Sequence, residues 1–272
     1  MKKDIVKYAA PVVVFIALFV LFYPRTKRPD TTPRDYAEIV ESGVLRAVTE
    51  YDAISYHATD DTISGFHYEL LQAFARSKGL EVEITPVMSF HDRLEGVLSG
   101  RYDILAHHTP ITTELRDTLL FTHPIQLGKL VLVQRQEDAD TDSTYAIHTL
   151  LDLAGKTLYV PQGSPAQLRI HNLSNEIGDS IHICEVERYG SEQLLAMVAH
   201  GDIDYAVCEE KIARASQADF PQLDIRTAIS FTQFYAWGVN EASPALRDTL
   251  NAWLESYSKT KEYKALKKKY DQ

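Results

Sequence analysis

The chain has 272 residues, 45% hydrophobic and 24% charged, which is the composition of an ordinary globular protein with one large domain or two small ones. Its formal net charge of −10 argues against a nucleic-acid partner, which requires a basic face. Its two cysteines exclude a dense disulfide framework and a four-cysteine zinc site.

The N-terminus carries the clearest signal in the sequence. Three lysines precede an apolar run ending at Tyr23, and residues 5–23 approach the roughly 20 residues that a membrane-spanning helix needs. A cleaved signal peptide requires a shorter apolar core and small residues before the cut, which "LFYPRTKRP" lacks. We expect an uncleaved anchor at 1–23 and a linker at 24–43. The protein would then be a single-pass protein of the bacterial inner membrane with its soluble domain in the periplasm.

After the linker, short apolar strands alternate with helical patterns, which predicts a mainly parallel α/β fold. The first set comprises strands at 44–50, 80–87 and 102–108 and helices at 65–79 and 89–100. The second comprises strands at 156–163, 180–189 and 203–210 and helices at 164–173 and 191–201. In the helix of residues 164–173, Ser164 fits the N-cap and Pro165 the first helical position.

An internal similarity relates the two sets. "LEGVLSGRYDILAHH" and "LLAMVAHGDIDYAVCEE" share a helix, a Gly-x-x-Asp turn and a short strand, and the positions five residues after each Asp are His108 and Glu209. Ligands of open α/β sheets bind outside the carboxyl ends of the strands. We therefore predict two lobes facing one cleft, with lobe 1 at 44–133 plus 233–272 and lobe 2 at 134–232.

Six segments carry a family resemblance. They are "GFHYELLQAFARSKGLEVEIT", "LSGRYDILA", "TELR" before "LLFTHP", "LLDLAGKTLYVPQGS", "HGDIDYAVCEEKIA" and "KTKEYKALKKKY". Over residues 45–270 the chain resembles family 3 of the periplasmic solute-binding proteins, which implies a type II clamshell that binds an amino-acid-like ligand. The spacing from "LRAVTE" to "ISY" is similar to that of the binding-like module of membrane-bound lytic transglycosylases F. Their catalytic domain is expected to be missing here.

The resemblance implies a set of ligand contacts. In the family, a Thr-x-x-Arg helix start holds the α-carboxylate, a Gly-Ser helix start in the second lobe adds backbone N–H groups, and an acid holds the α-amino group. Free N–H groups at a helix N-terminus do favour an anion. The second and third elements match here as Gly163-Ser164 and Glu209. The strand-end residues His107 and His108 and the loop residues Tyr51 and Tyr56 complete the candidate list.

The carboxylate clamp has two possible registers. Counted from Asp103, the family's arginine slot falls on Leu115, and because one helical residue is a turn of about 100°, Arg116 then points away. If Thr113 is instead the N-cap, Thr113-x-x-Arg116 restores the clamp, and the extra residue is absorbed around Pro110. Thr112, Thr113 and Arg116 are therefore candidate ligand contacts. Arginine's bidentate fork explains why a substitute would be poor. The sequence leaves both registers open.

Other chemistry receives little support from the sequence. His107 and His108 could be drawn with Cys208 and Glu209 as a zinc site, but consecutive strand residues point to opposite faces. A Gly-rich phosphate loop and a nucleophile elbow are absent from the sequence. We expect a non-catalytic binding protein without metal or cofactor. Its ligand would be an amino acid or short peptide, and its partner a transporter or a cell-wall enzyme. The alternatives are an interaction module with a vestigial cleft and a small-acid dehydratase.

Overall fold

The computed structural model describes residues 32–59, 62–137 and 146–270. The predicted membrane anchor at 1–23 and the first part of the predicted linker lie outside these residues. Within the described ranges, every helix is too short or too polar to cross a bilayer.

The first lobe is built on a six-stranded sheet with the order β4-β1-β5-β13-β6, in which β7 also pairs with β13. β1 runs parallel to β4 and β5, whereas β13, from the far end of the chain, runs antiparallel to β5, β6 and β7. The strands are β1 (Val44–Thr49), β4 (Glu81–Pro86), β5 (Ile104–Pro110), β6 (Leu119–Phe121), β7 (Gln126–Gly128) and β13 (Gln233–Asn240).

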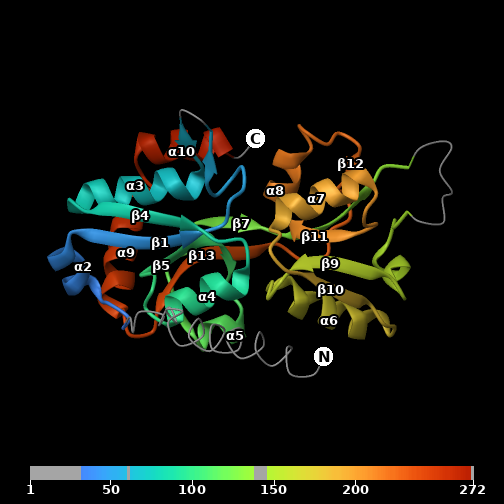
Figure 1. Cartoon of the computed structure of the whole chain (residues 1–272), viewed down its shortest axis with the longest axis horizontal. Helices are drawn as coiled ribbons and strands as arrows, with labels where there is room; N and C mark the ends of the chain where they lie inside the picture. The colour runs from blue at the N-terminus through green and yellow to red at the C-terminus, as the bar shows by residue number, and fades with distance from the viewer. Residues whose placement is uncertain (1–31, 60–61, 138–145, 271–272) are drawn as a thin grey trace, which may run out of the picture. The chain divides into compact units, whose positions relative to one another are not determined.

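Helices cover this sheet and bury its apolar side chains (Figure 1). They are α2 (Tyr36–Ser42), α3 (Phe66–Lys78), α4 (Phe90–Leu98), α5 (Thr113–Arg116), α9 (Pro244–Tyr257) and α10 (Lys261–Tyr270), and the pair β2 (His57–Ala58) and β3 (Ile63–Ser64) precedes α3. Phe66, Leu70 and Phe74 recur every fourth residue and so share one face of α3, where they are fully buried in the lobe's core. Trp237 and Trp253 lie in the same core.

The second lobe contains a five-stranded sheet with the order β10-β9-β11-β8-β12. Its elements are β8 (Leu130–Arg135), η2 (Leu150–Leu153), β9 (Thr157–Pro161), α6 (Ala166–Ile177), β10 (His182–Val186), α7 (Ser191–His200), β11 (Ala206–Glu209), α8 (Glu210–Ser216) and β12 (Leu223–Asp224). Cys184 on β10 and Cys208 on β11 are both free thiols.

The chain passes between the two sheets twice. β7 ends at Gly128 in the first sheet and β8 begins at Leu130 in the second, so the first crossing is at Lys129. The sequence predicts the end of the first segment of lobe 1 at residue 133, whereas in the structure all of β8 pairs with β11 and β12 of the second sheet. The chain returns between Ser230 and β13. These crossings join the lobes beside the carboxyl end of β11.

Candidate functional site

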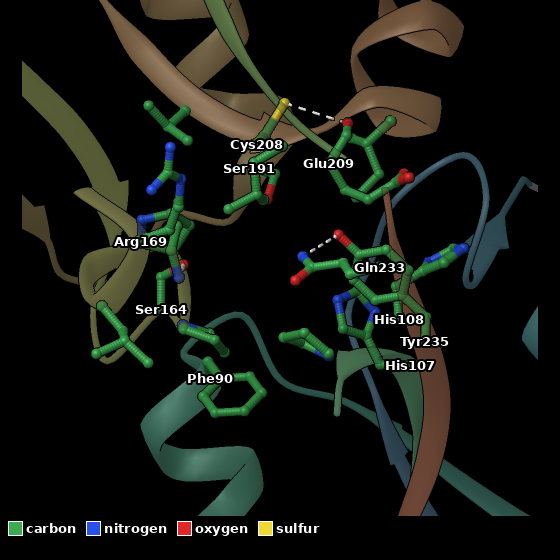
Figure 2. Close-up of a pocket in the computed structure, with 18 of the residues that line it drawn as sticks. Phe90, His107, His108, Ser164, Arg169, Ser191, Cys208, Glu209, Gln233 and Tyr235 are labelled. Atoms are coloured by element: carbon green, nitrogen blue, oxygen red, sulfur yellow. Dashed lines mark hydrogen bonds between the residues drawn. The ribbon is translucent and has the colours of Figure 1, made fainter. Parts of the chain in front are cut away.

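A cavity of about 230 Å³ lies between the two lobes. It is smaller than most ligand pockets, which measure roughly 300–1,000 Å³, and therefore suits a small ligand. Figure 2 shows Phe90, His107 and His108 on the wall of lobe 1, Ser164, Arg169 and Ser191 on that of lobe 2, and Gln233 and Tyr235 from β13. The lining also includes Thr112, Cys208 and Glu209. Five of the predicted site residues thus line the cavity: His107, His108, Thr112, Ser164 and Glu209.

The structure distinguishes between the two registers of α5. Thr112 is the N-cap, and its hydroxyl accepts a hydrogen bond from the Leu115 N–H at 3.3 Å. Leu115 is buried in a cluster with Phe90 and Leu119, and Arg116 is exposed and outside the cavity lining. Thr113 is also exposed and outside the lining. In this structure Arg116 and Thr113 do not form a carboxylate clamp in the cavity, because burial of Leu115 fixes the helix rotation that turns Arg116 to solvent.

The start of α6 also differs from the predicted anion site. The Gly163 N–H donates to Glu185 Oε1 at 2.7 Å, and the Ser164 N–H donates to the Pro161 carbonyl at 3.0 Å. Pro165 has no N–H, and the Ala166 N–H donates to Ser164 Oγ. The helix begins at Ala166, with Pro165 rather than Ser164 at its cap. The N–H groups of Gly163, Ser164 and Ala166 are therefore all bonded within the protein and are not available to a ligand anion.

Gly163 has a structural role at the contact between the lobes. Its φ of 69° is in the left-handed region, and a Cβ at this position would lie 2.8 Å from the His91 Cβ of lobe 1. Gly163 itself is outside the cavity lining. Glycine is thus required here for its backbone conformation and for the close approach of α4. This role is structural, whereas the sequence predicts a ligand contact at Gly163.

Glu209 ends β11 and caps α8. Its Oε2 accepts a hydrogen bond from the Lys211 N–H at 2.8 Å, whereas its Oε1 is buried without a hydrogen-bond partner among the described residues. The carboxylate and the Tyr235 ring both lie against Gly128, which has no side chain to obstruct them. Burial raises the pKa of Glu209 to about 7. Glu209, the residue predicted to hold a ligand ammonium, therefore lines the cavity, but its Oε1 is packed against Gly128.

Glu50 and Arg93 form a buried ion pair that the sequence analysis missed. Glu50 Oε2 lies 2.7 Å from the Arg93 guanidinium, and each side chain is 2% exposed. Glu50 Oε1 accepts the Ser191 N–H at 2.9 Å, at the start of α7 in the other lobe. A second bond between the lobes joins the Ala53 N–H to Glu192 at 2.7 Å. An acid at the carboxyl end of β1 was the available signal, but its partner Arg93 is 43 residues away and could not be paired from sequence.

The histidines belong to a hydrogen-bonded chain in lobe 1. The Trp237 indole N–H donates to His67 Nδ1 at 2.8 Å, so the His67 proton is on Nε2, which donates to His108 Nδ1 at 3.2 Å. His107 Nδ1 lies 3.0 Å from Ser55 Oγ and its Nε2 3.5 Å from Glu50. Burial holds the pKa of His67 and of His107 well below the usual value, so both rings are neutral.

Tyr51 and Tyr56 lie at the edge of lobe 1. Their rings contact each other edge-on with centroids 6.4 Å apart, and the Tyr51 hydroxyl donates to the Ala58 carbonyl. Tyr56 also packs edge-on against Tyr68. Neither tyrosine lines the cavity, so the predicted aromatic ligand clamp is not formed in this arrangement.

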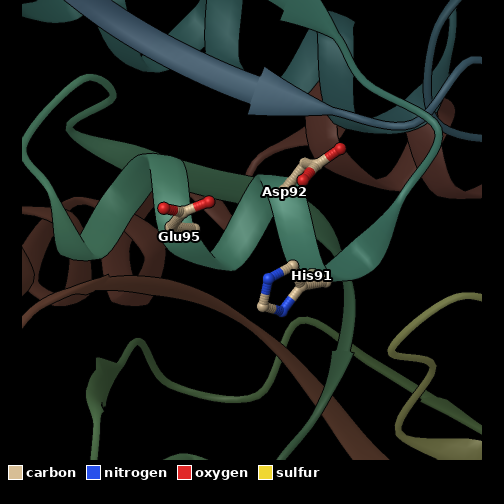
Figure 3. Close-up of side chains that lie close together, drawn as sticks. All are labelled: His91, Asp92 and Glu95. Atoms are coloured by element: carbon tan, nitrogen blue, oxygen red, sulfur yellow. The ribbon is translucent and has the colours of Figure 1, made fainter. Parts of the chain in front are cut away.

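Outside the cavity, His91, Asp92 and Glu95 bring their side chains together on α4 (Figure 3). Their potential ligand atoms lie within 4.8 Å of one another, but His91 and Asp92 are exposed and Glu95 is only half-buried. Exposed acidic groups often gather without binding a metal. We therefore assign no metal centre to these three side chains.

Two α/β lobes, two crossings and a cavity between the lobes define a two-lobed solute-binding protein. Residues 45–272 match the family model of the bacterial extracellular solute-binding proteins, family 3, and the chain belongs to this family. It is similar to membrane-bound lytic murein transglycosylase F of Aeromonas hydrophila, at 28% identity over 77% of this chain and 41% of the relative. The same-named protein of Pseudomonas fluorescens is 24% identical over 94% of this chain and 51% of the relative. The chain thus spans about half or less of these relatives.

Solved structures agree on the fold. A mutant of the arginine-binding protein of T. maritima is 25% identical with a TM-score of 0.73, covering 86% of this chain and 97% of that one. An ancestral arginine-binding protein bound to arginine is 23% identical with a TM-score of 0.72, covering 84% and 98%. The predicted α/β periplasmic-binding fold is therefore confirmed.

Proposed function

We propose that this chain is a membrane-anchored, extracytoplasmic binding module that closes its two lobes over a small amino-acid-like or peptide ligand and catalyses no reaction. The observation that carries the proposal is the cavity between the lobes, which is bridged by the Glu50 to Ser191 and Ala53 to Glu192 hydrogen bonds. Bonds that join one lobe to the other exist only when the cleft is closed, so they favour a closure mechanism.

The names of the relatives support a role near the cell wall. Several are called lytic murein transglycosylases, and the match covers 41–51% of the two cited above. We propose that this chain senses wall-derived peptides and acts on a cell-wall enzyme, with delivery to a transporter as the other possibility. The apolar N-terminal run supports an inner-membrane anchor with the binding module in the periplasm. Retention of the full chain in the membrane pellet after a carbonate wash tests the anchor, and a soluble form starting near residue 24 contradicts it.

Ligand-induced stabilisation tests the binding function. The full chain is screened by thermal shift against free amino acids, their N-acetyl and amide derivatives, and wall-peptide fragments. A ligand at a hundred times its Kd stabilises the folded state by about 2.7 kcal/mol, which raises the Tm of a domain of this size by several degrees.

Two leucines of lobe 2 provide a matched pair of variants for this screen. Leu168 lines the cavity and is 38% exposed, whereas Leu151 lies outside the lining and is 68% exposed. Leu168→Trp should obstruct the cavity and abolish the shift, and Leu151→Trp should retain it. If no compound stabilises the wild type, the binding function is refuted.

Two observations favour a second candidate, an interaction module with a vestigial cleft. The arginine expected to hold a carboxylate is exposed, and the predicted anion site of α6 is used internally. This candidate predicts no ligand-induced shift and equal behaviour of both leucine variants. The same screen therefore decides between the two functions.

A further inference from the structure

The arginines and Glu50 of the cavity lining are paired with other groups of the protein, and the charged-group atoms without a partner among the described residues, Arg93 Nε and Glu209 Oε1, are buried. Arg93 is paired with Glu50 and also donates to the Val87 and Met88 carbonyls at 2.6 and 2.9 Å. Glu50 in turn accepts from the N-terminus of α7 at Ser191. A ligand carboxylate at this place would have to displace the protein's own carboxylate, which already has both the guanidinium and the helix N–H as partners.

Arg169, the other arginine of the lining, is also engaged. Its Nε donates to the Ile229 carbonyl at 2.8 Å, and its two terminal nitrogens lie 2.6 and 3.1 Å from the two oxygens of Glu176. This bidentate geometry is the strongest form of an arginine–carboxylate contact. Arg116 is outside the lining and the N–H groups of α6 are used internally, so both arginines of the described lining are committed to partners within the protein.

The cavity is no better suited to a ligand ammonium. The buried Oε1 of Glu209 has no accessible surface, and the Tyr235 ring packs beside it over Gly128. His107 is neutral because burial lowers its pKa. The accessible polar groups of the cavity include the neutral amides of Asn172 and Gln233. The Gln233 amide reaches the space between the two walls in Figure 2, where its Nε2 donates one hydrogen bond to the Tyr235 hydroxyl at 2.9 Å and its Oε1 stays available as an acceptor. Apolar side chains such as Phe90 and Leu168 complete the wall.

We infer that the cleft selects an uncharged ligand of the amide class, such as an amino-acid unit blocked at both ends or an internal stretch of a peptide, and discriminates against free zwitterionic amino acids. This inference rests on the proposed binding function and specifies its ligand. The physical reason is desolvation: a zwitterion entering the cavity loses its water and gains no opposite charge, whereas an amide recovers its hydrogen bonds from neutral amides.

A matched series of leucine compounds tests the inference by calorimetric titration of the full chain at pH 7. The probes are leucine, N-acetyl-leucine, leucinamide and N-acetyl-leucinamide, which share one side chain and differ in which of their two charged groups is replaced by an amide. We expect N-acetyl-leucinamide to bind at least about tenfold more tightly than leucine, a difference of about 1.4 kcal/mol. Equal or tighter binding of leucine overturns the inference but supports the binding function, and binding of no compound refutes both.

The glutamine pair identifies the site of binding. Gln233→Leu should weaken binding of N-acetyl-leucinamide by about tenfold, because it removes a neutral hydrogen-bonding partner inside the cavity. Gln222→Leu, at an exposed position of lobe 2 outside the lining, is the control and should bind as the wild type does. If both variants retain full affinity, the amide contact proposed for Gln233 is wrong.

Discussion

The two turns share the Gly-x-x-Asp pattern but have opposite surroundings. The Asp103 side chain, before β5, has no exposed surface and is held by Arg34 and Arg46, with Arg46 at 2.8 Å. The Asp204 side chain, before β11, is 51% exposed and lies 2.7 Å from Arg135. Arg34 comes from the segment before α2 and covers the first turn, whereas the second turn remains open to solvent. The same motif therefore contributes differently to stability according to what covers it.

The strands that follow the two turns differ in the same way. His108, near the end of β5, is joined through His67 to Trp237 in the core of lobe 1. Glu209, at the end of β11, caps α8 because its side chain accepts a hydrogen bond from the Lys211 N–H. Side chains that are equivalent in sequence thus serve the structure of their own lobes, and neither points a free charge into the cleft.

The largest effect is expected at the buried turn. Asp103→Ala leaves two arginines without their shared carboxylate, and breaking a buried ion pair costs about 3–5 kcal/mol. Asp204→Ala is the matched control and should cost less than about 1 kcal/mol, since exposed pairs contribute little. Urea denaturation measures both. Equal losses for the two variants would show that covering of the turn has no energetic effect.

A pH-dependent effect is expected at Glu209. Its folded pKa of about 7, raised from 4.5, corresponds to about 3 kcal/mol. Because the folded pKa is raised, the associated stability is fully present below pH 4.5 and is lost as pH rises through 7. Glu209→Gln should therefore lose less stability than the wild type across this window, as measured by Tm against pH. The surrounding titratable groups are Cys208, Glu210, Lys211 and Tyr235.

The slope of the wild type should not vanish entirely in the variant. Burial, followed by the neighbouring Glu50, raises the pKa of Asp52 from 3.8 to about 8, so this group also lowers the stability as pH rises between those two values, which include the whole window of Glu209. Parallel curves for wild type and Glu209→Gln between pH 4.5 and 7 would mean that Glu209 ionises as an ordinary surface acid.

The smallest of these effects concerns the α5 register. Leu115→Ala removes a buried side chain and should cost about 2–3 kcal/mol. Arg116→Ala, one residue further on, is exposed and should change stability by less than about 0.5 kcal/mol, with no loss of ligand affinity. Chemical denaturation and titration with N-acetyl-leucinamide provide the two readouts. A tenfold weaker affinity of Arg116→Ala would place its guanidinium in the cleft after all.

The sequence predicted much of the fold because its periodic elements agree with their tertiary surroundings. The apolar positions of α3 and the strand of residues 102–108 are examples, and the internal repeat correctly suggested two similar halves. The points where the chain crosses between the lobes were less predictable, since the apolar sequence of β8 would suit a strand of either sheet. The pairing of β8 with β11 and β12, which lie far away in the chain, assigns it to the second sheet.

The site was predicted less well than the fold, for two physical reasons. The α5 register depends on the burial of Leu115. Two registers that differ by one residue fit the sequence equally well, and only tertiary packing selects one of them. The Glu50 to Arg93 pair and the contact of Gly163 with His91 join residues far apart in the chain, so no local pattern announces them. His107, His108, Thr112, Ser164 and Glu209 were found because their positions follow from strand and helix ends.

The most direct test of the account compares the wild type with Glu209→Gln in calorimetric titrations with N-acetyl-leucinamide and with leucine at pH 7. If the cleft is neutral toward its ligand, both proteins bind N-acetyl-leucinamide within about twofold of each other, and both bind leucine at least about tenfold more weakly. A loss of tenfold or more on Glu209→Gln, with leucine the tighter ligand of the wild type, would contradict the account and show that the family's ammonium contact operates in this chain.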